Sequence, residues 1–246
     1  MSWFVFGTIL VALVVGLVLA YSRDMRRALA QAGVEQQRVE TPRGPIAYTS
    51  HGEGAAVLVV HGWGGGGAGG YNMFEFLSHE GFRVLSVSRP GYLGTPLQVG
   101  ETMESQADAL AALLDALDIP SVAVVTGSGG APVSVLFALR YPDRCWGLIL
   151  ASALTRPDPI LGKSAVQKAL EKAFYSGFLV WLITKFFWRS LVEAGMGRLN
   201  ERIRSDAKKM NALQRLTQGL ILSSRCREGL INDMRQWAQM PIYPLP

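Results

Sequence analysis

Histidine and cysteine are scarce in this chain. Its 246 residues include three histidines, His51, His61 and His79, and two cysteines, Cys145 and Cys226. Two cysteines are too few for a disulfide framework, and neither they nor the scattered histidines match the spacing of a metal site. The sequence therefore excludes a disulfide-stapled protein and predicts no metal and no other cofactor. We expect both cysteines to be buried or idle thiols.

The phosphate-binding P-loop pattern G-x-x-x-x-G-K-[ST] is also absent from the sequence. The shorter pattern G-x-G-x-x-G does occur from Gly62 to Gly67, after an apolar run and before a helical pattern. A dinucleotide site also needs an acidic residue at the end of the next strand, where this chain has Ser88-Arg89. Because glycine and alanine are so dense here, a chance match is the simpler interpretation, and we expect no bound nucleotide.

Charged residues are absent from Ser2 to Tyr21. This apolar run is long enough to cross a bilayer, and Trp3 and Tyr21 stand at its two ends as interfacial anchors. We therefore expect a transmembrane anchor over residues 1–22, followed by a polar, alanine-rich juxtamembrane spacer over residues 23–37.

A cleaved signal peptide is the alternative for this segment, since Val18-Leu19-Ala20 resembles a cleavage site. Signal peptides carry their positive charge before the apolar run, whereas Arg23, Arg26 and Arg27 follow it here. By the positive-inside rule this arrangement favours an uncleaved, single-pass anchor with the rest of the chain in the cytoplasm.

The stretch from 121 to 142 has the pattern of a strand, a tight turn and a helix. Residues 122–125 form a continuous apolar run, typical of a parallel strand buried on both faces. Small residues fill 126–130, and apolar residues then recur at helical spacing. Such a turn holds Ser128 in a strained, exposed position and directs a helix N-terminus at whatever it attacks, as in a nucleophile elbow.

This turn departs from the usual G-x-S-x-G pattern, because Thr126 occupies the first small position. Strand and helix crowd together there, so a β-branched side chain is expected to strain or shift the turn. A merely glycine-rich loop between a strand and a helix is the alternative interpretation of residues 126–130.

Alternating strands and helices are expected along the rest of the core. An amphipathic helix is predicted at 102–117, and a helix through Phe74 and Leu77. This alternation predicts a mostly parallel α/β sheet that helices cover on both faces. Besides 122–125, strands are expected at 38–41, 46–49, 56–60, 83–87 and 146–151, the first two antiparallel.

In their order and spacing, four segments resemble the α/β-hydrolase family. They are V-L-V-V-H-G-W-G-G-G at 57–66, S-R-P-G-Y-L-G-T-P at 88–96, the turn at 126–130, and R-Y-P-D-R at 140–144 with the G-L-I-L-A-S-A that follows. The resemblance covers residues 38–153 and implies the first six strands of the α/β-hydrolase core.

The resemblance also implies roles for individual residues. Ser128 would be the nucleophile of a serine hydrolase, and the backbone amides of Trp63 and Gly129 would form the oxyanion hole. His61 would brace its loop rather than act as a base, and we expect structural roles for His51 and His79. Serine at position 128 argues against the branches of the family that use an aspartate nucleophile.

Residues 154–240 are expected to form a helical lid. Residues 156–235 contain 15 Lys or Arg against 7 Asp or Glu, so the lid accounts for the net charge of +5. No recognition motif accompanies this charge, and we expect no nucleic acid. The aromatic run at 174–188 is too short for a second span. It is predicted either to pack on the core or to contact an acyl chain or the membrane.

No histidine follows His79, although the family order is serine, acid, then histidine. The resemblance places that acid after a seventh strand and the histidine after an eighth, and residues 241–246 fall where a linker into the seventh strand would run. The sequence thus predicts a membrane-anchored serine hydrolase, without the part that carries the acid and the histidine.

The expected substrate is a small-molecule ester with an apolar acyl group, cleaved through a Ser128 acyl-enzyme in an esterase- or lipase-like reaction, and the expected partner is membrane lipid. The alternative is a catalytically incomplete, hydrolase-like protein that binds a ligand or a partner at the membrane.

Deleting residues 1–22 should convert salt-resistant membrane attachment into a weaker, salt-sensitive association. Each Lys or Arg near an anionic leaflet contributes about 1 kcal/mol, which falls off within a Debye length. Flotation with anionic liposomes at low and high salt measures the difference. If the shortened chain fails to float at low salt, the positive charge of the lid is only a solvated surface.

Overall fold

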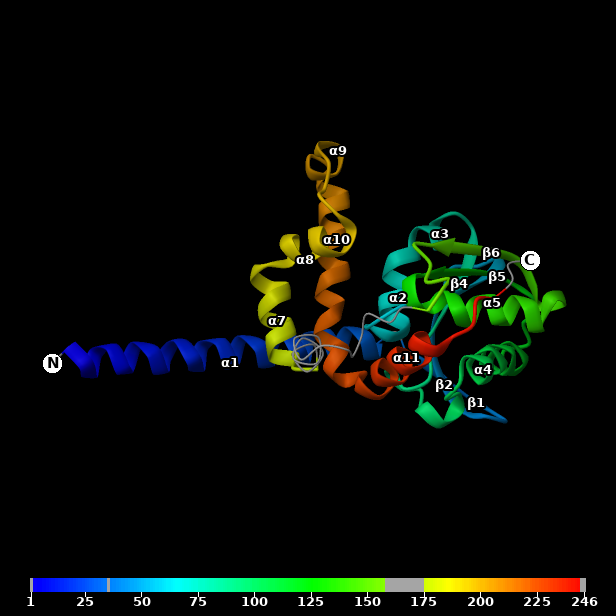
Figure 1. Cartoon of the computed structure of the whole chain (residues 1–246), viewed down its shortest axis with the longest axis horizontal. Coiled ribbons are helices and arrows are strands. Elements are labelled where there is room, and N and C mark those ends of the chain that lie inside the picture. Colours follow the sequence, from blue (N-terminus) through cyan, green and yellow to red (C-terminus); the bar gives the residue numbers. More distant parts are fainter. Residues whose placement is uncertain (1, 35, 158–174, 244–246) are drawn as a thin grey trace.

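In this computed structural model, residues 2–34, 36–157 and 175–243 are described. Part of the expected lid, residues 158–174, and the last three residues of the expected linker lie outside them. The described chain divides into a sheet with its covering helices, a long N-terminal helix, and a group of helices between the two (Figure 1).

A six-stranded sheet forms the core of the described residues, in the order β1-β2-β4-β3-β5-β6. The first two strands form an antiparallel hairpin, and β2 also pairs antiparallel with β4, while β4, β3, β5 and β6 are parallel. The predicted α/β fold class is confirmed. The strands are β1 Gln37–Thr41, β2 Gly44–His51, β3 Ala55–Val60, β4 Phe82–Val87, β5 Val122–Gly127 and β6 Cys145–Ala151.

Helices cover both faces of the sheet, and the strand periodicity decides which side chain meets which helix. Leu58 and Val124 pack toward α4 (Met103–Ala116) and α5 (Ala131–Arg140). Their neighbours Val57 and Val125 pack on the other face, toward α2 (Gly66–Phe74) and α3 (Phe76–His79). Since successive side chains of a strand point to opposite faces, the fully apolar runs seen in the sequence are what a doubly covered sheet requires.

The strand β6 lies at one edge of this sheet. Its outward side chains remain uncovered by the described residues, with Trp146 56% and Ile149 57% exposed.

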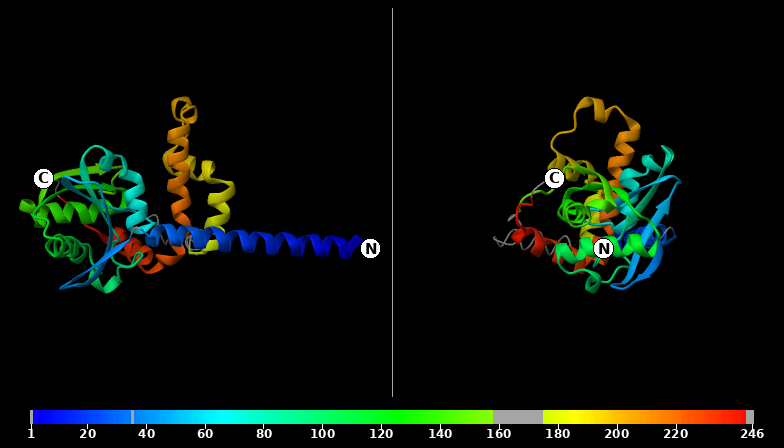
Figure 2. Two further views of the ribbon diagram at one scale, coloured as in Figure 1. Left: turned by 180° about the vertical axis from the view of Figure 1, so that it is seen from behind. Right: turned by 90° about the vertical axis from the view of Figure 1, so that its right-hand side faces the viewer.

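The N-terminal helix α1 runs without interruption from Ser2 to Val34 and projects far from the sheet (Figures 1 and 2). Its segment Trp3–Ala30 is the one helix among the described residues that is long and apolar enough to cross a membrane. Large apolar side chains in its first half are exposed, as Phe4 shows at 87%. In the second half, which overlaps the expected spacer, Met25 and Ala32 are buried against the lid.

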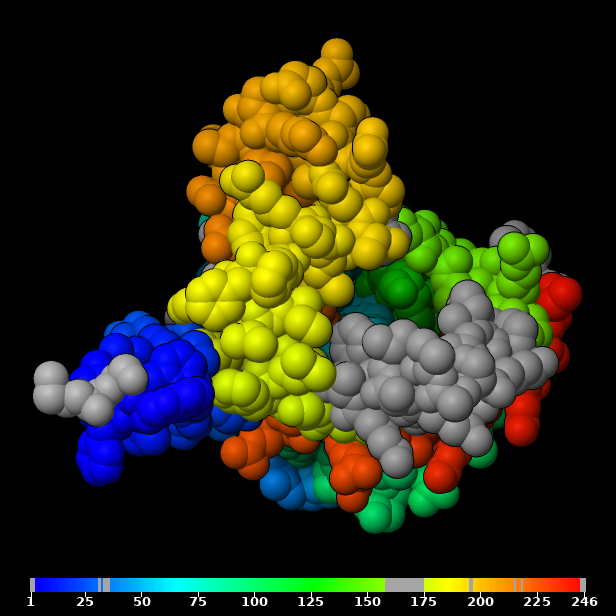
Figure 3. All heavy atoms as spheres, turned by 60° about the vertical axis from the view of Figure 1, so that its left-hand side comes forward, coloured from blue at the N-terminus to red at the C-terminus, as the bar shows by residue number. Residues whose placement is uncertain are grey.

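The described part of residues 154–240, which we call the lid after its expected role, is helical and stands between α1 and the sheet. Figure 3 shows α7 and α8 beside α1, with α10 rising beyond them. The aromatic segment forms α7, which packs on α1 through rings of Tyr21 and Phe178 at 5.5 Å. The lid elements are α7 Gly177–Phe186, α8 Trp188–Met196, α9 Glu201–Arg204, α10 Ala207–Gly219, the 3-10 helix η4 Leu220–Arg225, and α11 Arg227–Gln239.

The last helix, α11, returns to the core and docks on the loop after β4 through two glycines. The Gly229 N–H donates to the Gly91 carbonyl oxygen at 3.1 Å. A Cβ on Gly229 would lie 2.5 Å from the Tyr92 ring, so only glycine allows this approach.

Gly229→Ala should therefore lower the free energy of unfolding by about 1–3 kcal/mol, because the added methyl overpacks the contact. Gly219→Ala at the end of α10 is the matched control, since a Cβ there meets nothing within 4 Å. We expect the control to change stability by less than about 0.5 kcal/mol. Denaturant unfolding of the full chain in detergent measures both values, and equal losses would contradict this docking.

Candidate active site

Ser128 lies where β5 ends and a helix begins. Its φ angle is +52°, the left-handed region that non-glycine residues rarely adopt, and its side chain is exposed. Such strain is of order 1–3 kcal/mol and persists only where neighbouring structure enforces it. Here α5 follows directly from Ala131, with Pro132 in its first turn, and the Leu154 N–H holds the Ser128 carbonyl oxygen at 3.0 Å. The strained, exposed position predicted for this serine is thus the one observed.

Thr126 neither displaces the turn nor leaves its hydroxyl unpaired. It is fully buried in β5, in parallel register with Val60, and its Oγ1 donates to the Val60 carbonyl oxygen at 2.8 Å. Gly130 makes room for it, because a Cβ there would lie 2.6 Å from the Thr126 Oγ1. The strain expected from a β-branched residue is relieved by a glycine four residues later.

The loop after β3 runs against the Ser128 turn. A Cβ on Gly62 would lie 2.7 Å from the Gly127 carbonyl oxygen and 3.3 Å from the Gly129 nitrogen. This contact brings together the two segments that carry the Trp63 and Gly129 amides. It also gives Gly62 a packing role that needs no phosphate ligand.

The helix α11 covers the same turn from the lid side. The ring of Trp237, which is 8% exposed, lies directly over Gly129. Any side chain at position 129 would therefore collide with the ring. The sequence pattern did not predict this contact, because it joins residues that are far apart in the chain.

Arg89 is the buried centre of the site, and the sequence reasoning missed its role. Its Nε donates to the His61 carbonyl oxygen at 2.9 Å and its Nη2 to that of Gly62 at 3.1 Å. Its Nη1 donates to Asp233 Oδ1 at 2.8 Å and to Gln106 Oε1 at 3.2 Å, while Nη2 also meets Asp233 Oδ2. One side chain thereby joins the loop after β3, the helix α4 and the lid helix α11.

The charges of this cluster are fixed by their surroundings. Burial alone would lower the pKa of Arg89, but the adjacent Asp233 carboxylate raises it above its ordinary value. Burial, and then the same carboxylate, raise the pKa of Tyr92 well above 10.0, so its hydroxyl stays protonated and donates to Asp233 Oδ2 at 2.5 Å. A buried ion pair of this kind is stable because hydrogen bonds satisfy both partners.

His61 braces the loop, as its position in the sequence indicated. Its Nε2 accepts from the Arg89 backbone N–H at 3.0 Å, which leaves Nδ1 to donate to the Gly62 carbonyl oxygen at 2.8 Å. Burial, and then the charge of Arg89, lower its pKa to about 3. Elsewhere, the His51 ring stacks on Tyr71 at 4.0 Å, and His79 is exposed at the end of α3.

No metal site is present among the described residues, in which no three His, Cys, Asp or Glu side chains converge. Cys226 is buried, which raises the pKa of its thiol to about 11, and Cys145 is half-buried. Neither cysteine forms a disulfide. Because the thiolate is the reactive form, Cys226 is inert at neutral pH.

Comparisons with known proteins support the same architecture. Residues 55–186 match the family model described as alpha/beta hydrolase fold. An alpha/beta hydrolase fold protein from Nakamurella multipartita is 34% identical with a TM-score of 0.70, over 82% of this chain and 74% of that one. A thermophilic esterase from Thermogutta terrifontis is 25% identical with a TM-score of 0.57, over 84% of this chain and 73% of that one.

Two relatives found by sequence are also named as hydrolases. An uncharacterized hydrolase, YcgS, of Bacillus subtilis (strain 168) is 29% identical over 85% of this chain and 77% of its own length. A 2-hydroxy-6-oxo-6-phenylhexa-2,4-dienoate hydrolase of Comamonas testosteroni is 36% identical over 43% of this chain. That match spans 38% of the second protein, well under half of its length.

Acidification should destabilise the protein through His61. The folded protein holds this imidazole neutral down to about pH 3, whereas its ordinary pKa is 6.5. Between these values the unfolded chain binds a proton that the folded chain does not, so stability falls as the pH drops, by up to about 1.4 kcal/mol per pH unit.

Denaturant unfolding of the full chain in detergent at pH 7, 5.5 and 4 measures this slope. His61→Gln should be less stable at pH 7, because two hydrogen bonds are altered, but should lose less stability on acidification. His79→Gln, an exposed control, should keep the slope of the unaltered protein. A His61→Gln slope equal to that of the control would contradict the assignment.

Proposed function

The chain belongs to the alpha/beta hydrolase fold family, and on that premise we propose that it is a serine hydrolase with Ser128 as its nucleophile. The observation that carries this proposal is the conformation of Ser128, exposed with a φ of +52° between β5 and α5. A serine gains nothing structurally from a strained, solvent-facing turn, whereas a nucleophile gains access to the substrate carbonyl.

The reaction proposed is acyl transfer to Ser128 followed by hydrolysis. The Ser128 Oγ attacks the carbonyl carbon of an ester, and the negative charge that develops on the carbonyl oxygen is stabilised by the amides of Trp63 and Gly129. Collapse of the tetrahedral intermediate releases the alcohol and leaves an acyl-serine, which water then hydrolyses to the acid. Arg89 would act as a positioning residue, because it holds the loop that carries Trp63.

An ester with an apolar acyl group is the substrate class that we favour. The similarity to an esterase supports the ester bond. The aromatic sequence of the lid favours an apolar acyl group. The proposed site of action is a membrane surface, which the exposed apolar surface of α1 supports.

The mechanism also needs a general base, to which we assign no residue. His61 is held by two hydrogen bonds and has a strongly lowered pKa, and the His51 ring is stacked on Tyr71. These observations favour the second candidate function, a hydrolase-like protein that binds an ester or an acid without turning it over. The same site residues would then recognise the carbonyl group without cleaving it.

A fluorophosphonate probe distinguishes the two functions, because it modifies only an activated serine. The full-length protein should be labelled, and Ser128→Ala should abolish the labelling. The matched control is Ser152→Ala, which alters another exposed serine with a positive φ, +48°, at the end of the neighbouring strand β6. Labelling that persists in Ser128→Ala and disappears in Ser152→Ala would overturn the nucleophile assignment. No labelling of any variant would favour the binding protein.

A further inference from the structure

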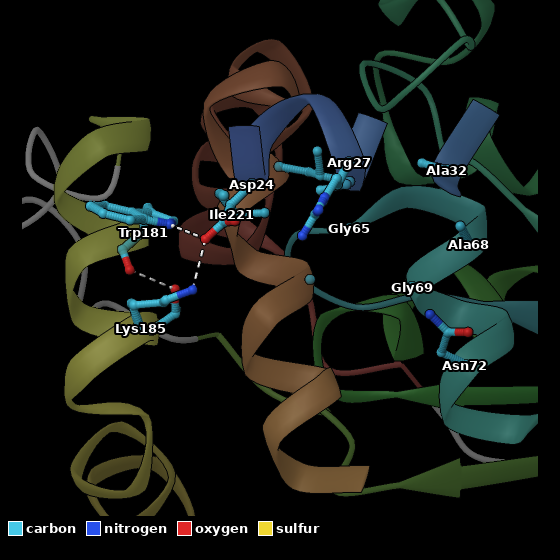
Figure 4. Close-up of a pocket in the computed structure, with 14 residues that line it drawn as sticks. Asp24, Arg27, Ala32, Gly65, Ala68, Gly69, Asn72, Trp181, Lys185 and Ile221 are labelled. Atoms are coloured by element: carbon cyan, nitrogen blue, oxygen red, sulfur yellow. Dashed lines mark hydrogen bonds and ion pairs between the residues drawn. The ribbon is translucent and has the colours of Figure 1, made fainter. Parts of the chain in front are cut away.

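A cavity of about 560 Å³ lies between the inner half of α1 and the lid, on the side of the core where α2 begins (Figure 4). Its walls come from α1, the start of α2, α7 and the segment around η4. None of its lining residues belongs to the Ser128 turn or to the Arg89 cluster. Its volume lies within the range of small-molecule sites in proteins, about 300–1,000 Å³.

One wall of this cavity is charged. Asp24 Oδ2 accepts from Lys185 Nζ at 2.9 Å and from Trp181 Nε1 at 3.1 Å, while its Oδ1 accepts from Arg23 at 3.3 Å. Arg27, one turn further along α1, points across the cavity toward Gly65 (Figure 4). It makes no ion pair or hydrogen bond with any of the residues that the structure describes. Arg27 is exposed, so it places one positive charge that no described carboxylate pairs with at the solvent-accessible side of the cavity.

The end of α2 adds to this positive field. The helix begins at Gly66, and its N-cap Gly65 lines the cavity without a side-chain cap. The first amides are already used, since Gly67 N–H donates to Ser88 Oγ at 2.9 Å. The helix therefore contributes its dipole, whose positive end is attracted to an anion.

Another wall is apolar, beside the polar side chains of Asn72 and Thr184. Ala28 and Ala32 of α1 face Ile221 and Leu222, which are each 5% exposed. These residues continue the apolar surface of α1 inward from Tyr21. An apolar wall beside a single cation suits a molecule that carries an acyl chain and an acidic group.

We propose that this cavity binds an anionic amphiphile, whose carboxylate or phosphate group pairs with Arg27 and whose acyl chain lies along Ala28, Ile221 and Leu222. The proposal goes beyond catalysis and does not depend on the assignment of the nucleophile. On α1, Arg27 lies within the last turn before Ala30, where the segment long enough to span a membrane stops. With α1 inserted in a membrane as the sequence predicts, the cavity would lie next to the membrane surface.

The test uses Trp181, which lines the cavity, as an internal reporter. Full-length Ser128→Ala protein in phosphatidylcholine nanodiscs is titrated with 9,10-dibromostearate, because bromine quenches nearby tryptophan fluorescence and this background cannot use Ser128 for hydrolysis. Quenching of Trp181 is obtained by subtracting the quenching measured in the same protein carrying Trp181→Phe. We expect saturable quenching by the acid and little by its uncharged methyl ester.

Two variants within the cavity and one control outside it test the site. Arg27→Ala should raise the apparent dissociation constant about tenfold, the usual effect of losing a charged hydrogen-bond partner. Arg26→Ala alters a neighbouring arginine that is exposed like Arg27 but does not line the cavity, and it should change the constant less than about twofold. Gly69→Leu should abolish quenching by filling the cavity, since a Cβ there meets nothing within 4 Å. Equal effects of the two arginine variants, or no quenching that depends on Trp181, would overturn the proposal.

A second experiment tells whether the bound anion is a membrane phospholipid or a free fatty acid. It compares nanodiscs that contain dibrominated phosphatidylglycerol with nanodiscs that contain dibrominated phosphatidylcholine. Stronger Trp181 quenching by the glycerol lipid would identify a membrane phospholipid, whereas quenching by the free acid alone would identify a fatty acid. Either result supports an anionic amphiphile. Equal quenching by both phospholipids and no response to the acid would contradict it. Fluorophosphonate labelling of Ser128 is independent of all these outcomes.

Discussion

The buried ion pair between Arg89 and Asp233 is the interaction on which the arrangement of the site depends. Removing two charges from water is costly, and a pair of this kind is stable only when its remaining hydrogen-bonding groups are also satisfied. Arg89 meets that condition through the carbonyl oxygens of His61 and Gly62 and through Gln106, and Asp233 through Tyr92. These residues are therefore required together, because the loss of one would leave polar groups of the others buried without a hydrogen-bond partner.

This constraint links the lid to the core. Asp233 belongs to α11, whose Trp237 covers Gly129 and whose Gly229 docks on Gly91. At its other end the lid packs on α1, where Trp181 and Lys185 hold Asp24. The lid is consequently tied both to the turn that carries Ser128 and to the helix proposed to enter the membrane. A spacer that separates anchor and core would provide neither contact.

The parts predicted from sequence are those that local patterns determine. Each predicted strand was found within about two residues, because apolar runs between turn residues specify buried strands directly. The conformation of Ser128 also follows from neighbours in sequence. Arg89 and Asp233 are 144 residues apart, and no local pattern pairs them. The burial of Met25 and Ala32 was likewise hidden, because a polar, alanine-rich helix has the same composition whether it is free or covered by a lid.

The glycine-rich loop after β3 shows how one sequence pattern can serve a purpose other than the one it suggests. Gly62 is needed because the Gly127 carbonyl oxygen would lie 2.7 Å from its Cβ, and Gly67 because the Ser86 carbonyl oxygen would lie 2.8 Å from its Cβ. Gly64 is needed because its φ is +79°. These requirements account for glycines that otherwise resemble a nucleotide fingerprint. The loop passes from the Ser128 turn at Gly62 to the α1 cavity at Gly65, with Trp63 between them. The proposed oxyanion amide and the proposed amphiphile site are therefore built on one short, closely packed segment, and a change of backbone at either end must be accommodated by the other.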